Sequence, residues 1–293
     1  MNMHRIEESE LIINPDGSIF HLHLKPGEIA ENIILVGDPG RVEMIASFFE
    51  EVEVRRSNRE FVSCTGWYNK KRITVVATGI GTDNIDIVLN ELDALVNVDF
   101  ETRTAKAQLT QLNFVRIGTS GSLQKDIPVD SWLLSEKAIG FDGLLNFYAR
   151  RNDVTDAGFE NAFKAALDWN AQLTAPYVID AGNELIQKLD GPQVVKGVTI
   201  SAPGFYGPQG RVIRLGLADA DINSKINGFR YNGNRVTNYE MECSAIYGLS
   251  ALMGHRAATV CVIIANRLAG TYSKDYKVVV KELVQYVLKQ LTM

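Results

Sequence analysis

The 293-residue sequence has few cysteines and no long apolar run. Cys64, Cys243 and Cys261 are far apart and form no CxxC pair, which argues against a disulfide framework and against a zinc site. A reducing cytosol suits such a chain. The longest apolar run, Ala257–Ala265, is nine residues long and too short to span a bilayer. The N-terminus also lacks the apolar core of a signal peptide, so we expect a cytoplasmic protein without a membrane partner.

The net charge is small, and the sequence contains no complete glycine-rich nucleotide-binding motif. The formal net charge of -5 argues against broad binding to nucleic acid. The stretch Gly79–Asn84 begins like a dinucleotide fingerprint, but Asn84 stands where the third glycine belongs. No Walker A pattern occurs either. A nucleotide site of one of these common types is therefore not indicated.

Short apolar strands alternate with helical patterns along the chain. The expected strands cover residues 32–38, 73–81, 114–123, 130–140, 194–201 and 257–267. The expected helices cover residues 40–49, 85–96, 160–173, 181–190, 241–254 and 273–291. This alternation predicts an α/β fold with three layers, α/β/α, around a central mixed, mostly parallel sheet. We expect one domain, residues 1–293, in which residues 1–19 form an N-terminal extension.

Cationic and small residues follow several of the expected strands, at the sheet edge where such folds bind ligands. Arg116 lies inside an apolar strand, where a buried guanidinium needs a partner. A structural salt bridge would explain it equally well. Thr119 follows in a glycine turn, and Arg41 lies in the first turn of a helix after Gly37, where anions are favoured. Together these residues predict a cradle for an oxyanion such as phosphate.

The segment Asn238–Ala245 places Glu240 and Glu242 two residues apart where a helix is expected to begin. At such a junction one of the two carboxylates can point into a pocket. An ionised carboxylate accepts hydrogen bonds and donates none, which suits a pair of sugar hydroxyls. Capping of the helix N-terminus is the alternative explanation.

The segment Ser201–Arg214 contains adjacent aromatic rings, Phe205 and Tyr206, together with Gln209 and Arg211. A surface loop has no need of this combination. The rings can stack on a flat ligand, and the amide and guanidinium can bind its polar edge.

In this order and at these spacings, the motifs resemble those of the nucleoside phosphorylase superfamily and, within it, the uridine phosphorylase branch. The resemblance runs from about Phe20 to Arg267, through FHLHL, VGDPGRV, SNREF, ATGIG, FVRIGTSGSL, GFYGPQGR, NYEMECSA and IIANRL. It implies the nucleoside phosphorylase fold. It also implies phosphorolysis of uridine, with deoxyuridine as a second candidate, to uracil and (deoxy)ribose 1-phosphate in pyrimidine salvage or catabolism.

The resemblance also implies roles for individual residues. Phosphate would be bound by Gly37, Arg41, Arg59, Arg116 and Thr119. The base would be bound by Phe205, Gln209, Arg211 and Arg267, and the ribose by His21, Glu240, Met241 and Glu242. Catalysis would depend on Arg116, Arg211, Gln209 and Glu242. His21 and Arg59 would act across a subunit interface, which implies a homo-oligomer of at least two chains.

The implied reaction needs no cofactor, and inorganic phosphate is a co-substrate beside the nucleoside. Glu60 and Ile80 match a monovalent-cation position of some relatives, but Asn84 replaces the usual small hydroxyl residue there. Purine-cleaving relatives carry a Ser-Asp pair where this chain has Asn266 and Arg267, so we expect a preference for pyrimidines. Two other functions fit the same scaffold: a nucleosidase that hydrolyses the nucleoside, and a non-catalytic nucleoside-binding protein.

Overall fold

The computed structural model describes residues 4–293, so residues 1–3 of the expected N-terminal extension lie outside the described residues. The strands are β1 Asn32–Val36, β2 Glu51–Asn58, β3 Phe61–Tyr68, β4 Lys71–Ala77, β5 Val98–Asp99, β6 Thr104–Ala105, β7 Asn113–Ser122, β8 Trp132–Gly140, β9 Tyr177–Asp180, β10 Val194–Ser201, β11 Arg230–Tyr231, β12 Asn234–Glu240, β13 Arg256–Asn266 and β14 Thr271–Tyr272. The α-helices are α1 Pro39–Ala46, α2 Thr82–Asn97, α3 Ala157–Leu167, α4 Asn183–Leu189, α5 Ile222–Gly228, α6 Cys243–Met253 and α7 Tyr276–Thr292. Short 3-10 helices are η1 Leu144–Phe147, η2 Arg151–Asp153 and η3 Gly207–Gln209.

The main sheet is mixed and consists of two parallel blocks. Strands β4, β1, β7 and β13 run parallel to one another, and so do β8, β10 and β12. The blocks meet antiparallel between β13 and β8. The sheet then curls so that β12 also pairs with β7, through Asn238 with Ser122 and Tyr239 with Gly121. This pairing closes a ring of strands and brings the end of β12 beside the carboxyl end of β7.

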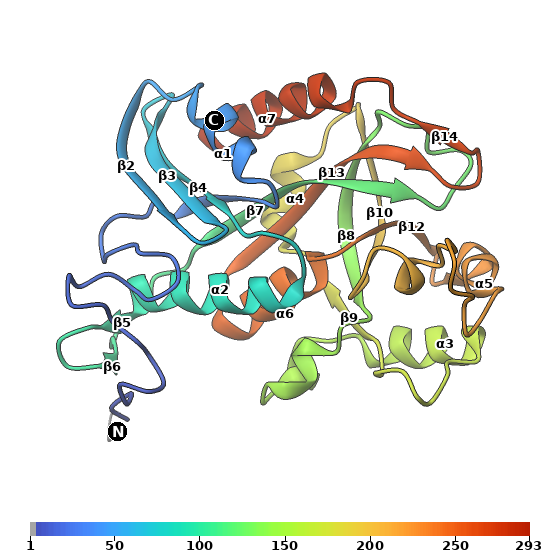
Figure 1. Cartoon of the computed structure of the whole chain (residues 1–293), viewed down its shortest axis with the longest axis horizontal. Coiled ribbons are helices and arrows are strands. Elements are labelled where there is room, and N and C mark those ends of the chain that lie inside the picture. Colours follow the sequence, from blue (N-terminus) through green and yellow to red (C-terminus); the bar gives the residue numbers. More distant parts are fainter. Residues whose placement is uncertain (1–3) are drawn as a thin grey trace.

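Helices cover both faces of the sheet, which confirms the three-layer α/β/α prediction (Figure 1). One apolar core joins α2 and α6 to the sheet, through residues such as Leu89 and Ile246. A second core joins α1, α4 and α7 to the opposite face, through residues such as Val42, Leu185 and Leu283. A third, smaller core lies under α3 and α5. The tips of β1, β7 and β13 are thus fixed between packed layers.

Several elements differ from the sequence prediction. Strands β2 and β3 were not predicted, because β2 is an exposed edge strand in which Glu51, Glu53, Arg55 and Arg56 hide the strand pattern. Helix α3 ends at Leu167, before the expected boundary at residue 173, because Asp168 takes a left-handed backbone with φ 48°. None of the helices within residues 4–293 combines the length and the apolar composition needed to cross a membrane.

Candidate active site

Most of the predicted site residues meet in one cavity of about 670 Å³ at the tips of β1, β7 and β13. Its walls include Gly37, Arg41, Arg116, Thr119, Phe205, Gln209, Arg211, Glu240, Met241 and Glu242. His21, Arg59 and Arg267 were also predicted but do not line it. The cavity therefore joins the anion cradle (Gly37, Arg41, Arg116 and Thr119), the carboxylate pair and the aromatic loop (residues 205–211).

Arg116 projects from β7 and is buried, with 6% of its surface exposed. Its Nη2 donates to Glu242 and lies 3.5 Å from Glu240 Oε2. Burial alone would lower the pKa of Arg116, but the two glutamates outweigh it and raise the pKa above its ordinary value. The guanidinium is thus both salt-bridged and part of the cavity wall. A structural salt bridge and an anion-binding position, the two explanations considered for Arg116, are therefore compatible.

Arg41 brings a second positive charge to the anion cradle. The local sequence starts α1 as expected, because Asp38 accepts the Gly40 N–H at 2.9 Å and Pro39 is the first helical residue. This places Arg41 in the first turn, where its Nη1 lies 3.5 Å from the Ile117 carbonyl. Burial, followed by the charge of Arg116, lowers the pKa of Arg41. Two guanidinium groups in one cavity repel each other and therefore favour a bound anion.

The two carboxylates, Glu240 and Glu242, have different hydrogen-bond partners. Glu240 accepts the backbone N–H groups of Glu242 and Cys243 at 2.8 Å and 2.9 Å, and the Ser201 hydroxyl at 2.5 Å. It therefore caps the start of α6, and burial raises its pKa to about 7 against the opposing effect of Arg116. Glu242 instead contacts Arg116 and accepts the Gly81 N–H at 2.7 Å. Both carboxylates line the cavity, and Glu240 alone also caps the helix.

The aromatic loop is held by hydrogen bonds from two arginines. Arg267 donates to the carbonyls of Gln209 and Gly210, the second at 3.1 Å. Arg211 donates to Gln209 Oε1 at 2.5 Å and to the Phe205 carbonyl at 2.5 Å. Gln209 is almost fully buried, and its Nε2 has no hydrogen-bond partner among residues 4–293. The loop therefore presents an amide donor and a guanidinium to the cavity.

The stacking geometry of this loop differs from the simple expectation. The guanidinium carbon of Arg211 lies 3.8 Å from the centroid of the Phe205 ring, so it covers one face of that ring. Burial, and then the charge of Arg267, lowers the pKa of Arg211. Phe205 itself is 50% exposed. A bound base must use the other face of Phe205, or Arg211 must move from the first.

Sequence reasoning missed several residues of the cavity wall. Ser120 Oγ is buried in this wall without a hydrogen-bond partner in the described part of the chain. Tyr239, Ile264 and Tyr272 line the same cavity. Ser120 and Tyr239 are adjacent to predicted residues in the same motifs, so proximity in sequence was an available signal. Tyr272 lies on β14, and nothing in its sequence context indicates the site.

His21 and Arg59 lie together outside the cavity wall. Arg59 occupies the tight β2–β3 turn with φ 53°, and its guanidinium carbon lies 5.7 Å from the centroid of the Phe20 ring. The Asn58 Nδ2 donates to the His21 carbonyl at 2.8 Å, which ties this turn to the segment that carries the histidine. The structure therefore groups the two residues that were expected to act across an interface.

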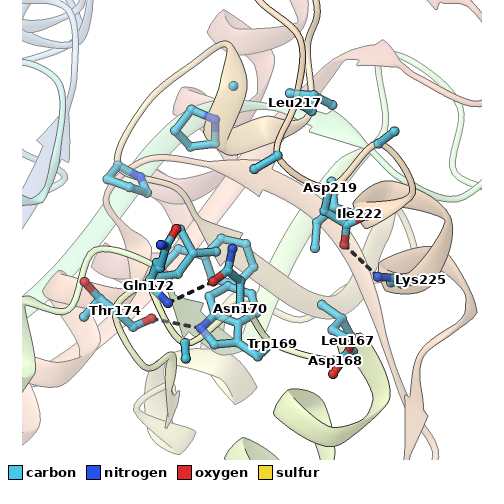
Figure 2. A pocket seen from close by; sticks show the side chains of 18 of the residues that line it. Leu167, Asp168, Trp169, Asn170, Gln172, Thr174, Leu217, Asp219, Ile222 and Lys225 are labelled. Carbon is cyan, nitrogen blue, oxygen red and sulfur yellow. Dashed lines mark hydrogen bonds and ion pairs between the residues drawn. The ribbon is translucent and has the colours of Figure 1, made fainter.

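A second cavity, of about 990 Å³, lies beside the aromatic loop, between the loop after α3 and the segment before α5 (Figure 2). Its polar groups bind one another: Lys225 Nζ lies 2.7 Å from Asp219 Oδ2, and Trp169 Nε1 donates to the Thr174 carbonyl at 3.2 Å. None of the predicted site residues lines it. Because most of the predicted residues line the smaller cavity instead, we place the candidate site there.

No group of three or more His, Cys, Asp or Glu side chains in residues 4–293 could hold a metal ion.

Comparisons with known proteins agree with this geometry. A uridine phosphorylase of Thermococcus kodakarensis is 29% identical over 259 residues, which cover 88% of this chain and 81% of that protein. A DeoD-type purine nucleoside phosphorylase of Bacillus cereus is 30% identical over 271 residues, covering 92% of this chain and 96% of that protein. The solved nucleoside phosphorylase of Trypanosoma brucei, reported to show uridine phosphorylase activity, superposes with a TM-score of 0.86 at 29% identity, covering 96% and 99% of the two chains.

The predicted nucleoside phosphorylase fold is thereby confirmed. The sequence model of the family described as the phosphorylase superfamily matches residues 31–291, nearly the whole chain and all of the cavity wall. The chain belongs to the phosphorylase superfamily.

Proposed function

We propose that this chain is a uridine phosphorylase, which cleaves uridine with inorganic phosphate to give uracil and ribose 1-phosphate. One observation supports this above the others. A single cavity is lined by the cations Arg41 and Arg116, the donors Gln209 and Arg211, and the carboxylate of Glu242. Phosphate, ribose and base fit in series along such a cavity. The chain is then an enzyme of the pentosyltransferase class.

The geometry suits a direct displacement at the sugar. A phosphate oxygen bonds to C1′ of the ribose while the C1′–N1 bond breaks and its electron pair leaves with the uracil. The transition state is expected to resemble an oxocarbenium ion, as in glycoside cleavage. Arg41 and Arg116 hold the phosphate beneath C1′, and Arg211 and Gln209 stabilise the negative charge that grows on the base. The protein contributes position and charge, with phosphate as a co-substrate and no further cofactor.

The aromatic loop determines the choice of base in this proposal. Along one edge uracil presents an acceptor, a donor and an acceptor, whereas cytosine lacks the ring N–H. The amide of Gln209 offers two donors and an oxygen that accepts from Arg211 and keeps a second lone pair for the ring N–H, and Arg211 offers donors only. A buried partner left unpaired costs about 1–3 kcal/mol, so cytidine is rejected. The curated relatives named for uridine and for purine nucleosides are about equally identical to this chain, so overall identity does not decide the base.

A phosphate-dependence assay across uridine, deoxyuridine, thymidine, cytidine and inosine tests the proposal. We expect uridine turnover only with phosphate, and little turnover of cytidine or inosine. Uridine cleavage in phosphate-free buffer would instead identify a nucleosidase. Calorimetric binding of uridine, with no product after long incubation with phosphate, would identify a nucleoside-binding protein. The deoxyuridine and thymidine arms define tolerance for the missing hydroxyl and the added methyl group.

We also propose that the site is shared between two copies of the chain, with His21 reaching the ribose and Arg59 the phosphate of the partner's site. Their grouping outside the cavity supports this. Coexpression of Arg59→Ala and Arg116→Ala chains tests it. Each variant alone should be nearly inactive, whereas a mixed dimer retains one complete site, so coexpression should restore about one quarter of wild-type activity. No recovery, with mixed dimers present, would show that each chain uses its own Arg59.

Two further proposals concern the chain as a whole. Residues 1–293 form one domain, with residues 1–19 as an N-terminal extension. Its described part, residues 4–19, is attached by the bonds from Arg103 Nε to the Ile6 carbonyl at 3.0 Å and from Arg103 Nη2 to the Leu11 carbonyl. The enzyme acts in the cytoplasm in pyrimidine salvage or catabolism. The unpaired, buried thiols of Cys64, Cys243 and Cys261 support a reducing location.

A further inference from the structure

Glu91 is a buried carboxylate on α2 whose hydrogen bonds all go to one short segment, residues 21–22. Its side chain is 10% exposed, and no Lys or Arg of residues 4–293 lies within ion-pair distance of it. It accepts the backbone N–H groups of His21 at 3.0 Å and Leu22 at 2.9 Å, and its Oε1 lies 2.6 Å from His21 Nδ1. A buried acidic residue without a cationic partner is costly unless its hydrogen bonds are satisfied. All of the contacts that satisfy it here involve the backbone of residues 21–22 and the His21 ring.

These contacts fix the state of the imidazole. A carboxylate only accepts hydrogen bonds, so the proton of the neutral ring lies on Nδ1 and Nε2 presents a lone pair. The ring packs edge-on against Phe20 and Phe61, at centroid distances of 4.7 Å and 6.4 Å. The His21 side chain is 27% exposed, and Nε2 has no hydrogen-bond partner in residues 4–293. The fold therefore presents one defined acceptor at its surface.

The surroundings of this acceptor are also constrained. The neighbouring Arg59 takes a left-handed backbone, which costs a non-glycine residue energy and persists only where the surrounding structure imposes it. Asn58 binds the His21 carbonyl and joins the two segments. We call Phe20, His21, Asn58, Arg59 and Glu91 the His21 cluster. It holds a cation and an oriented imidazole outside the cavity of its own chain, and these are groups that a phosphate and a sugar hydroxyl can use.

We propose that Glu91 is a positioning residue, which holds the His21 ring so that Nε2 accepts a hydrogen bond from the ribose 5′-hydroxyl of a nucleoside bound in a second copy of the chain. This inference rests on the proposed function and deepens it. A 5′-hydroxyl is a donor, so it complements an Nε2 lone pair. Glu91 touches no substrate in this arrangement and acts only through His21.

Glu91→Gln tests the proposal with little change in shape. The Gln oxygen can still accept the two backbone N–H groups, which turns its NH₂ group toward Nδ1. That NH₂ group donates, so the ring proton moves to Nε2 and the acceptor is lost. We expect KM for uridine to rise about tenfold, while KM for 5′-deoxyuridine changes less than about twofold, because a single hydrogen bond is affected. Glu91→Gln should add nothing further to His21→Ala.

A purely structural role would give a different pattern. Equal losses on uridine and 5′-deoxyuridine, or wild-type KM values for both, would overturn the proposal. Glu160→Gln is the control, because Glu160 is also buried and accepts the Val178 N–H at 3.1 Å, while its other partner is Arg151 and not His21. It should shift thermal stability without separating the two substrates.

A second measurement needs no variant. The ¹⁵N shifts of the His21 ring in the wild-type protein report which nitrogen carries the proton. We expect the Nδ1–H form, and an Nε2–H form would overturn the proposal even if Glu91→Gln failed to fold. If the wild type showed no phosphate-dependent uridine cleavage, the proposed function would fail, while this spectrum would still test how Glu91 holds the ring.

Discussion

One part of the cavity wall, the buried end, contains Arg116, which lies within β7, and Glu242, which lies at the start of α6, with 6% and 3% of their surfaces exposed. The other part is the aromatic loop, in which Phe205 is 50% exposed and Gln209 is 3% exposed. The first end is held by a buried ion pair between two packed layers, whereas the second is held by arginine bonds to loop carbonyls. In the proposed function, phosphate and sugar therefore meet a buried ion pair, whereas the base meets a loop that is partly exposed.

If the proposed site roles hold, this difference offers a way for one fold to serve several nucleosides. A change at the buried end disturbs the core and the reaction together, whereas a change in the aromatic loop alters contacts to the base alone. The similarity of this chain to enzymes named for uridine and for purine nucleosides fits that division. The predictions below test whether the two ends can be separated.

Arg116→Ala should have the largest effect, because it removes phosphate contacts and leaves two buried carboxylates without their partner. We expect phosphate-dependent kcat/KM to fall about 10³-fold and unfolding free energy to fall by about 3–5 kcal/mol. Steady-state kinetics and chemical denaturation measure both. Arg235→Ala is the control, since its pair with Asp126 is partly exposed and worth at most about 1 kcal/mol. Near-normal turnover of Arg116→Ala would remove the cradle from the mechanism.

Gln209→Ala should separate activity from stability. We expect kcat/KM for uridine to fall about 100-fold, because a donor to the leaving base is lost, while unfolding free energy changes by about 1 kcal/mol. Gln172→Ala, in the second cavity, should leave both unchanged. If Gln209→Ala destabilised the protein as strongly as Arg116→Ala, the aromatic loop would be as structural as the strands and the comparison would fail.

The pH dependence of stability should give the smallest effect, and it concerns the buried end only. Burial raises the pKa of Glu240 from 4.5 to about 7. Between these values the folded protein keeps a proton that the unfolded chain has released, so stability falls as pH rises through this window. Thermal melting from about pH 5 to about pH 8 in phosphate-free buffer measures the slope. Glu240→Gln should flatten it, and an unchanged slope would assign the effect to another group.

The strand tips were the most predictable part of the molecule. Asp38 and Pro39 start α1 as their sequence indicates, and the residues after β1 meet those of β7 because the two strands are parallel. The glycine turn expected at Thr119 is wrong, because β7 continues through it to Ser122. The division between Glu240 and Glu242 could not be predicted, because it depends on where α6 begins. The closure of β12 onto β7 could not be predicted either, since only long-range packing sets it. The contact of Arg211 with the Phe205 ring could not be predicted either, because it depends on the conformation of the folded loop.

The pairing of Gly121 with Tyr239 has a consequence for how the enzyme forms. It joins segments separated by most of the second half of the chain, and such non-local contacts slow folding because a long loop must close first. Until that closure, the guanidinium on β7 has no glutamates beside it. The cavity wall runs in sequence from Gly37 to Tyr272, so a growing chain has no complete pocket until residue 272 has emerged and docked.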